Sequence, residues 1–446
     1  MGKRALAAVA AAWILWMLPA APAASAEEGL REAVAADYEA YLEPLFVHFH
    51  RNPELSYRET ATAARIAAEL RGLGVEVTEG VGGTGVVGML RNGEGPTVMV
   101  RADMDGLPLR EATGLPYAST VTQVDVTGVE QPVMHACGHD VHVTSLVGTA
   151  RRLVALEDRW AGTVMLLAQP AEERIGGAKA MLEDGLYERF GVPDYALAFH
   201  VEAGEPAGKV MVPAELVASS SDSVDITVHG VGTHGASPHK GKDPIYVAAQ
   251  IVVALQGLIS RELSPLEPGV VTVGAFHAGS KHNIISDRAE LQLTVRADSE
   301  ETREQLLAGI RRVAENVARA AGLPEDKLPE VRLSTESTPT TVNDPDLARR
   351  IREAFARELG AEALYEERRD GMGAEDFAYF VQTEHRVPGV YFSVGGTAQA
   401  ELDAEAAGGP AVPGHHSPLF RIEPEPSVTT GVEAMTVAVL ELLGTR

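Results

Sequence analysis

Acidic, imidazole and thiol side chains gather directly after short apolar segments of the sequence. The apolar segments are residues 97–102, 163–168 and 195–199, and the groups that follow them are Asp103 and Asp105, then Glu172 and Glu173, then His200. Between the first two segments lies His-Ala-Cys-Gly-His-Asp (135–140), which leads into a helical pattern. Carboxylate, thiolate and imidazole donors brought together are what a transition-metal site needs. The sequence therefore predicts a metal centre.

Each of these groups also has a purely structural interpretation. A buried cysteine is usually a small apolar filler, and Cys137 could also be a free nucleophile. Paired glutamates are usually solvated, His200 could be a core histidine, and Asp103 and Asp105 could cap a loop. His415 and His416 could be a surface pair. Two observations favour a functional role over a structural one. Cys137 lies two residues before His139 at a helix start, where the helix dipole favours the thiolate form. Glu172 and Glu173 follow an apolar strand and a Gln-Pro turn, where a solvated position is less expected.

The apolar segments indicate the fold that positions these groups. They are apolar on both faces and alternate with helical patterns at 62–70 and 141–156. This alternation is typical of a mostly parallel α/β sheet covered on both sides. Ligand sites in such sheets form at the carboxyl ends of the strands. The groups above should therefore meet in one crevice.

A second pattern begins near residue 217. Val224, Ile226 and Val228 alternate with polar residues, a helix is expected over 243–263, strands over 270–276 and 289–296, and a helix over 300–321. This order predicts a smaller, ferredoxin-like α+β unit inserted into the first one. From 332 the chain is expected to return to the first unit and to end in a helix over 427–443. The expected division is 1–26 leader, 27–216 first part of the catalytic domain, 217–331 insert, and 332–446 second part.

The first 26 residues are typical of a cleaved signal peptide. Lys3 and Arg4 precede an apolar run over 5–18, which is short for a spanning helix, and Ala24-Ser25-Ala26 fits a cleavage site. An uncleaved membrane anchor is the alternative. The mature chain, starting near Glu27, is expected to be exported to the periplasm or secreted, with no membrane partner after cleavage. The single cysteine excludes an internal disulfide.

Length and charge limit the remaining possibilities. The 446 residues suggest two or three domains, and 45% hydrophobic with 23% charged residues is ordinary globular composition. The formal net charge of -25 argues against nucleic acid or an anionic membrane surface as a partner.

Several motifs together resemble a known family. They are FHRNPELSYRET from Phe49, RADMDGLPL from Arg101, HACGHDVH from His135, QPAEERIGGAKAML from Gln169, THGASPHKGKDP from Thr233, NIISD from Asn283, GAEDF from Gly373 and HHSPLF from His415. The chain resembles the di-metal aminoacylase/carboxypeptidase family (peptidase family M-twenty). Its motifs are most similar to the amidohydrolase branch, with hippurate hydrolase, auxin-conjugate hydrolases and N-acetyl-diaminopimelate deacetylase. Ser286 departs from a frequent proline, and residues 120–133 form a longer stretch than in typical members.

The resemblance implies a role for each matching residue. Two divalent ions, Zn or Mn, would be bound by Cys137, His139, Glu173, His200 and His416. His416 is chosen over His415 because the family ligand directly precedes a small polar residue and proline. Glu172 matches the general base, Asp105 the acid that orients the site, and Asp103 a residue behind the ligands. His234, Asn283 and Arg296 match groups that bind the substrate's oxyanion and carboxylate, reached across a homodimer interface by a dimerisation and lid domain.

The expected function is metal-dependent hydrolysis of the amide bond of N-acyl amino acids. One alternative is a metal-dependent carboxypeptidase or dipeptidase acting on small peptides. A hydrolase with Cys137 as nucleophile and a non-catalytic periplasmic binding protein are further alternatives. Glu172 argues against the last, because binding alone needs no general base beside the ligands.

Overall fold

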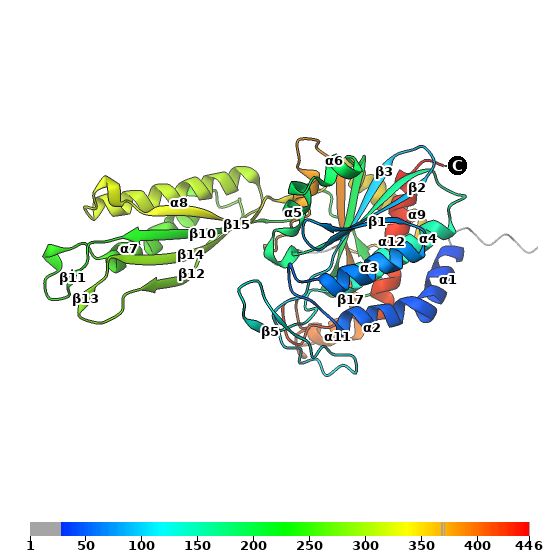
Figure 1. Cartoon of the computed structure of the whole chain (residues 1–446), viewed down its shortest axis with the longest axis horizontal. Coiled ribbons are helices and arrows are strands. Elements are labelled where there is room, and N and C mark those ends of the chain that lie inside the picture. The colour runs from blue at the N-terminus through cyan, green and yellow to red at the C-terminus, as the bar shows by residue number, and fades with distance from the viewer. Residues whose placement is uncertain (1–27, 367–368, 370, 446) are drawn as a thin grey trace, which may run out of the picture.

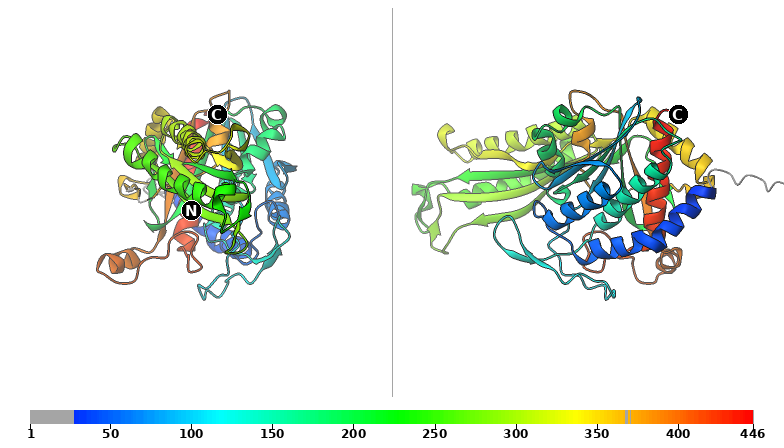
Figure 2. Two further views of the ribbon diagram at one scale, coloured as in Figure 1. Left: turned by 90° about the vertical axis from the view of Figure 1, so that its left-hand side faces the viewer. Right: turned by 45° about the vertical axis from the view of Figure 1, so that its right-hand side comes forward.

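The computed structural model describes residues 28–366, 369 and 371–445. The expected leader, residues 1–26, lies outside these residues. The described chain forms a large α/β unit and an elongated smaller unit that projects from one end of it (Figure 1). Figure 2 shows the molecule end-on, with the smaller unit toward the viewer (left), and the projection again in an oblique view (right).

The large unit is built on a seven-stranded sheet whose four central strands run parallel, while the pairs toward its edges are antiparallel. In sheet order the strands are β1 (Glu76–Val81), β2 (Gly85–Asn92), β6 (Gly162–Gln169), β3 (Thr97–Asp103), β7 (Tyr195–Pro206), β17 (Gly389–Thr397) and β8 (Val210–Met211). The central strands are buried on both faces, which explains their continuous apolar runs. The expected α/β class is confirmed.

Side chains alternate between two apolar cores, one on each face of this sheet. Val98 and Val100 face one core, and Met99 between them faces the other. The first core is covered by α1 (Glu28–Asp37), α2 (Glu43–Arg51), α3 (Thr60–Gly72), α4 (His139–Ala155), α9 (Pro345–Glu358) and α12 (Pro424–Leu442). The second is covered by α5 (Gly177–Glu183), α6 (Leu186–Phe190) and α10 (Ala378–Val381). Helices therefore cover both faces of the sheet, so a ligand can reach the strands only at their ends.

The smaller unit is a four-stranded antiparallel sheet with two helices packed on one face. Its strands, in sheet order, are β12 (Gly269–Ala278), β14 (Arg288–Ala297), β10 (Ser220–His229) and β15 (Glu330–Thr338), and its helices are α7 (Pro244–Gly257) and α8 (Glu300–Ala320). Asp243 caps α7 by accepting from Ile245 N and Tyr246 N, with Pro244 at the first helical position. The βαββαβ chain order with this strand order is ferredoxin-like, as expected.

The far boundary of this unit differs from the expectation. The chain was expected to return to the large unit at 332, but β15 runs to Thr338 and pairs with β10 inside the smaller sheet. The strand is polar and largely exposed along its first residues, so its sequence carries little apolar alternation. The two crossings between the units are instead marked by β9 (Leu216–Ala218) and β16 (Thr341–Val342), which pair with each other.

Short elements complete the fold. The short strands are β4 (Thr122–Val124), β5 (Glu130–Pro132), β11 (Thr233–His234) and β13 (Ile284–Ile285), and one further α-helix is α11 (Gln399–Ala406). Short π-helices lie at Tyr38–Leu42 and Leu258–Glu262, and 3-10 helices at Glu172–Arg174, Pro238–Lys240, Glu325–Lys327 and Ala361–Ala363. The long stretch at 120–133 is thus a hairpin of β4 and β5, tied to the chain at Leu55 by a hydrogen bond from Leu55 N to Gln123 Oε1 of 2.7 Å.

Candidate metal centre

The candidate site lies at the carboxyl ends of the parallel strands. Asp103 ends β3, Glu172 and Glu173 form the turn after β6, and His200 lies within β7. His139 begins α4, and His416 lies in the loop before α12. Because β6, β3 and β7 are parallel neighbours, these ends meet at one edge of the sheet.

The five residues proposed as ligands fall into two sets that share Cys137. One set is Cys137, His139 and His200, the other is Cys137, Glu173 and His416, and within each set the ligand atoms lie within 4.8 Å of one another. Cys137 Sγ is 3.4 Å from His200 Nε2. Glu173 links the sets, with Oε1 3.8 Å from His139 Nε2 and Oε2 3.4 Å from His416 Nε2. This arrangement can hold two neighbouring ions.

Two buried atoms in this group lack the partners that buried polar atoms normally have. His139 Nε2 and Glu173 Oε1 make no hydrogen bond within the described residues. Both point into the donor sets described above, where thiolate, imidazole and carboxylate suit divalent transition metals. The residues present therefore fit two divalent ions.

Asp105 fixes the geometry of both the glutamate turn and the His139 ring. Its carboxylate accepts from Glu172 N at 3.1 Å, from Glu173 N at 3.2 Å and from Ser56 Oγ at 2.6 Å. Its backbone carbonyl lies 2.8 Å from His139 Nδ1, which leaves Nε2 of that ring for a ligand role. These contacts place Asp105 where it can hold both groups, and its orienting role stays a prediction.

Asp103 lies behind the ligands, together with a histidine that the sequence reasoning missed. Asp103 accepts from Arg101 at 2.7 Å and pairs with His142 Nδ1. The other ring nitrogen of His142 accepts from Val201 N at 2.9 Å, and its ring centroid is 4.7 Å from that of His200. His142 therefore supports the β7 end of the site. The signal was available, because His142 follows His139 by three residues on α4, one helical turn along the same face.

The charges around the site favour cations. Burial, followed by the nearby Glu375 and Glu173 carboxylates, raises the pKa of Glu172 well above its ordinary value. Burial also raises the pKa of Glu173 to about 8. The same crowding disfavours negative charge on Cys137, whose pKa is raised by burial and then by Glu173 and Glu172. This direction is opposite to the lowering of the Cys137 pKa that was expected from the helix dipole. A divalent cation would relieve this crowding.

A cavity of about 570 Å³ opens onto the donor sets and includes one of the three residues expected from the smaller unit. Its lining combines Cys137, Glu172, Glu173, His200 and His416 with Arg296 and with apolar side chains such as Met211 and Val217. Arg296 lies on β14, and within the described residues its guanidinium makes no ion pair. The nearby carboxylate whose charge acts on it, Asp222, is bound by Arg303 at 2.8 Å. A second arginine, Arg369, is held by Asp298 at 3.0 Å. Of these two arginines in the cavity, Arg296 is thus the one without an ion pair within the described residues.

His234 and Asn283 lie elsewhere. They line a separate cavity of about 730 Å³ where β11 pairs with β13, at the tip of the smaller unit far from the large sheet (Figure 1). The structure therefore separates them from Arg296 and from the donor sets of the same chain. Their expected role at the metals of a second copy stays a prediction.

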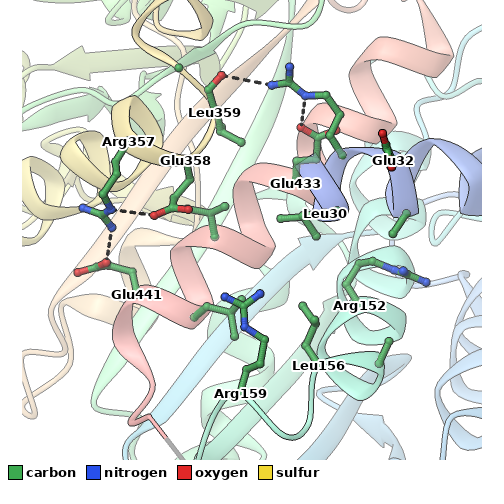
Figure 3. Close-up of a pocket in the computed structure, with 17 residues that line it drawn as sticks. Leu30, Glu32, Arg152, Leu156, Arg159, Arg357, Glu358, Leu359, Glu433 and Glu441 are labelled. Carbon is green, nitrogen blue, oxygen red and sulfur yellow. Dashed lines mark hydrogen bonds and ion pairs between the residues drawn. The ribbon is translucent and has the colours of Figure 1, made fainter. Parts of the chain in front are cut away.

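A further cavity, of about 760 Å³, lies on the large unit between α1, α4, α9 and α12 (Figure 3). Its charges largely neutralise one another: Arg357 pairs with Glu358 and Glu441, and Arg31 with Glu433. None of its lining residues belongs to the two donor sets. It is therefore not the candidate site.

Comparison with known proteins agrees with this geometry. Residues 99–407 match the model of peptidase family M20/M25/M40. The chain is 40% identical to hippurate hydrolase of Campylobacter jejuni over 349 residues, which cover 78% of this chain and 86% of the relative. It is 39% identical to thermostable carboxypeptidase 2 of Saccharolobus solfataricus over 350 residues, covering 78% of this chain and 83% of the relative.

The fold also matches a solved structure, that of the Bacillus subtilis YXEP protein, described as a dinuclear metal-binding peptidase. The TM-score is 0.71 at 29% identity, covering 92% of this chain and 100% of that chain. This likeness supports two metal ions in the present site. From the family match, the relatives and the fold together, the chain belongs to peptidase family M20/M25/M40 and is a hydrolase.

Proposed function

We propose that the protein hydrolyses the amide bond of N-acyl amino acids with two divalent ions, Zn or Mn. The observation that carries the proposal is one cavity lined by Glu172, by four of the five donor-set residues (all but His139) and by Arg296. A general base, cation ligands and a carboxylate-binding group are the three functions that this reaction requires. The relatedness to hippurate hydrolase supports the substrate class.

Each residue has a definite task in this reaction. Ions bound there would lower the pKa of a water molecule toward ~7 and polarise the amide carbonyl. Glu172 takes the proton of the attacking water and later gives it to the departing amine nitrogen. Arg296 presents a planar fork that binds the carboxylate of the amino-acid part. Its position in the same cavity as Glu172 sets the orientation of the scissile bond.

The proposed active form is a homodimer. His234 of one copy would stabilise the charge on the amide oxygen at the other copy's metals, with Asn283 beside it. The outer face of α7 supports this arrangement, since Tyr246 and Val253 are 58% and 73% exposed. Within the described residues, strand β12 is also an edge of the smaller sheet. A symmetric contact through α7 and β12 would cover both.

The helix over Pro244–Glu262 is long and apolar enough to cross a membrane by length and composition alone. Its inner face packs on the smaller sheet through Val247, Ile251 and Leu255, which are buried. Because the inner face of this helix is already buried in the smaller unit, only its exposed outer face remains to be covered, and a protein surface can cover it. We infer that a second copy of the chain, and not lipid, covers the outer face of this helix.

We also infer that the mature chain is exported and that it has no nucleic-acid partner.

The second candidate function is a metal-dependent carboxypeptidase or dipeptidase, favoured by the relatedness to thermostable carboxypeptidase 2. A peptide also ends in a carboxylate that Arg296 could bind, so the cavity accommodates both substrate classes. A Cys137 nucleophile is disfavoured, because burial and the neighbouring carboxylates raise the pKa of its thiol.

The test is a hydrolysis panel on one protein preparation. The chelated protein is reloaded with Zn or Mn and given N-acetyl and N-benzoyl amino acids alongside dipeptides with the same carboxyl-terminal residue. The proposal expects loss of activity on chelation, recovery on reloading and a preference for the N-acyl series. A preference for dipeptides would establish the second candidate. Full activity in the metal-free protein would exclude both.

A further inference from the structure

His415 lies beside the shared sulfur without belonging to either donor set. Its Nδ1 is 3.8 Å from Cys137 Sγ, and its ring centroid is 5.1 Å from that of His200. His200 contacts the same sulfur at 3.4 Å. Cys137 is therefore placed between two imidazoles, of which one belongs to the proposed ligands.

The backbone determines which nitrogen of His415 can donate. Ala203 N donates to His415 Nε2 at 3.1 Å. A peptide N–H is always a donor, so Nε2 must be the unprotonated nitrogen of the neutral ring. The proton then lies on Nδ1, the nitrogen that faces the sulfur. The ring is further held by Phe420, at a centroid distance of 5.0 Å.

Glu202 completes the surroundings of the ring. One carboxylate oxygen lies 3.6 Å from His200 Nδ1 and the other 3.3 Å from His415 Nε2. The His200 nitrogen already has an acceptor in Val201 O, at 2.7 Å. Glu202 thus spans the two imidazoles on either side of Cys137. The Glu202 carboxylate could accept a hydrogen bond from His415 Nε2 only if that nitrogen carried the proton, and the hydrogen bond that Ala203 N donates to it excludes this.

We propose that His415 is a positioning residue that donates its Nδ1–H to the Cys137 sulfur and holds that sulfur between the two donor sets. This goes beyond the five ligands and rests on the proposed metal centre. A hydrogen bond to a coordinating thiolate stabilises charge on sulfur and fixes the direction of its lone pairs. Partners of this kind typically change metal affinity by roughly 10- to 100-fold when removed.

The two ring nitrogens can be tested separately, since an asparagine amide lies where Nδ1 was and a glutamine amide where Nε2 was. His415→Asn keeps a donor toward the sulfur, His415→Gln keeps only the contact toward Ala203 and Glu202, and His415→Phe keeps neither. The readout is the sulfur-to-cobalt charge-transfer band and the Co²⁺ affinity of the full chain loaded with Co²⁺ alone, without substrate. His385→Gln is the control, because His385 is exposed and does not line the cavity at the donor sets.

The proposal expects the Asn variant to keep the band position of the parent. The Gln and Phe variants should shift the band to longer wavelength and bind Co²⁺ roughly 10- to 100-fold more weakly. Equal effects of Asn and Gln, or no effect of Phe, would overturn it. A change of the cobalt ligand-field bands in all three variants would make His415 a ligand and also overturn it. Absence of any thiolate band in the parent protein would instead contradict the proposed metal centre.

Discussion

Arg101 Nη2 lies 2.7 Å from Glu375 Oε1, although the two residues are 274 positions apart in the sequence. Arg101 is 1% exposed, and its guanidinium also donates to Asp103 and to Gln169. Asp376 lies 3.3 Å away. This buried arginine therefore joins the acid behind the metal ligands to the GAEDF motif of the second half of the large unit.

Replacement of Arg101 by methionine should destabilise the fold strongly. The change keeps much of the apolar stem but leaves the buried carboxylates of Asp103, Glu375 and Asp376 without their cation, which typically costs about 3–5 kcal/mol. Urea unfolding of both proteins measures the loss. Arg91→Met, at an exposed ion pair with Glu76, is the control and should change stability by less than about 1 kcal/mol. Equal midpoints for the Arg101 variant and the parent would contradict this account of the network.

Glu172→Gln should abolish proton transfer while retaining the metal. The expected loss in turnover is roughly 100- to 10,000-fold, because the amide cannot accept the proton of the attacking water. Cys137→Ser is the matched comparison, since it should lose metal from both donor sets. Metal analysis and steady-state kinetics on the same samples separate the two effects. Near-normal turnover of Glu172→Gln would refute the general-base role, and unchanged metal content of Cys137→Ser would show that Cys137 is filler.

Arg296→Ala should discriminate between substrates with and without a free carboxylate. The fall in kcat/KM should be roughly 10- to 100-fold for an N-acyl amino acid and small for its carboxamide, because only the former makes the charge-assisted pair. Arg288→Ala, an exposed position on the same strand, is the control. If acid and carboxamide suffer equally, Arg296 does not bind the carboxylate.

Mixing two inactive variants tests whether subunits share their sites. Glu172→Gln and His234→Ala are each expected to be inactive as homodimers. After subunit exchange, a mixed dimer contains one site with an intact Glu172 from one chain and an intact His234 from the other, so activity should return in part. Exchange must be followed separately by mass or fluorescence. Confirmed exchange without recovered activity would mean that each chain completes its own site.

Stability should depend on pH through His50, which bridges the start of α4 and the chain at Glu111. His50 Nδ1 is 2.7 Å from Asp140 Oδ2, and Nε2 is 3.3 Å from Glu111 Oε1. Burial opposes its charge, but these two carboxylates outweigh burial and raise the pKa of His50 from 6.5 to about 9. A raised pKa in the folded state means that the protonated form contributes stability below pH 6.5, and that this contribution is lost as the pH rises through about 9.

Thermal melts of the parent and His50→Gln at pH 6, 7.5 and 9.5 check this expectation, with metal content held constant. The neutral glutamine cannot provide the charged interaction, so the difference in Tm should be largest at the lowest pH and shrink toward the highest. The pH-dependent part should amount to roughly 3 kcal/mol, by the free energy of each pKa unit. A difference that does not change with pH would assign His50 a role in packing alone.

The sequence was most informative where one physical signal dominated. The largely apolar runs at 97–102 and 163–168 correspond to β3 and β6, since strands buried on both faces are mostly apolar. Arg101, the exception in the first run, is buried together with its carboxylate partners. Asp243 followed by Pro244 correctly predicted the start of α7. Strand β15 was missed because edge strands are specified by pairing, and its early residues Val331, Arg332 and Leu333 are all partly or fully exposed.

The same division holds for the candidate site. Cys137, Glu173 and His200 could be proposed because motifs and strand ends identify them. His142 and Glu202 were not proposed, since their roles depend on rings and carboxylates brought together only by folding. His415 was considered as part of a surface pair and as a ligand, for which His416 was chosen instead. Its contact with Cys137 bridges 278 positions that no local pattern records. The exclusion of His234 from its own chain's cavity likewise depends on how the smaller unit projects.

The donor sets draw on both ends of the chain, and this affects when the site can form. Cys137 and His200 precede the inserted unit, whereas His416 follows it and leads directly into α12, which packs against α4. A chain still being synthesised, or one truncated before residue 415, has the first set but not the second. Folding of the large unit must therefore wait for its carboxyl-terminal helix, with the smaller unit free to fold earlier from its own contiguous residues. Uptake of the second ion, the one held by the set that includes His416, would thus report that the last segment of the chain has docked.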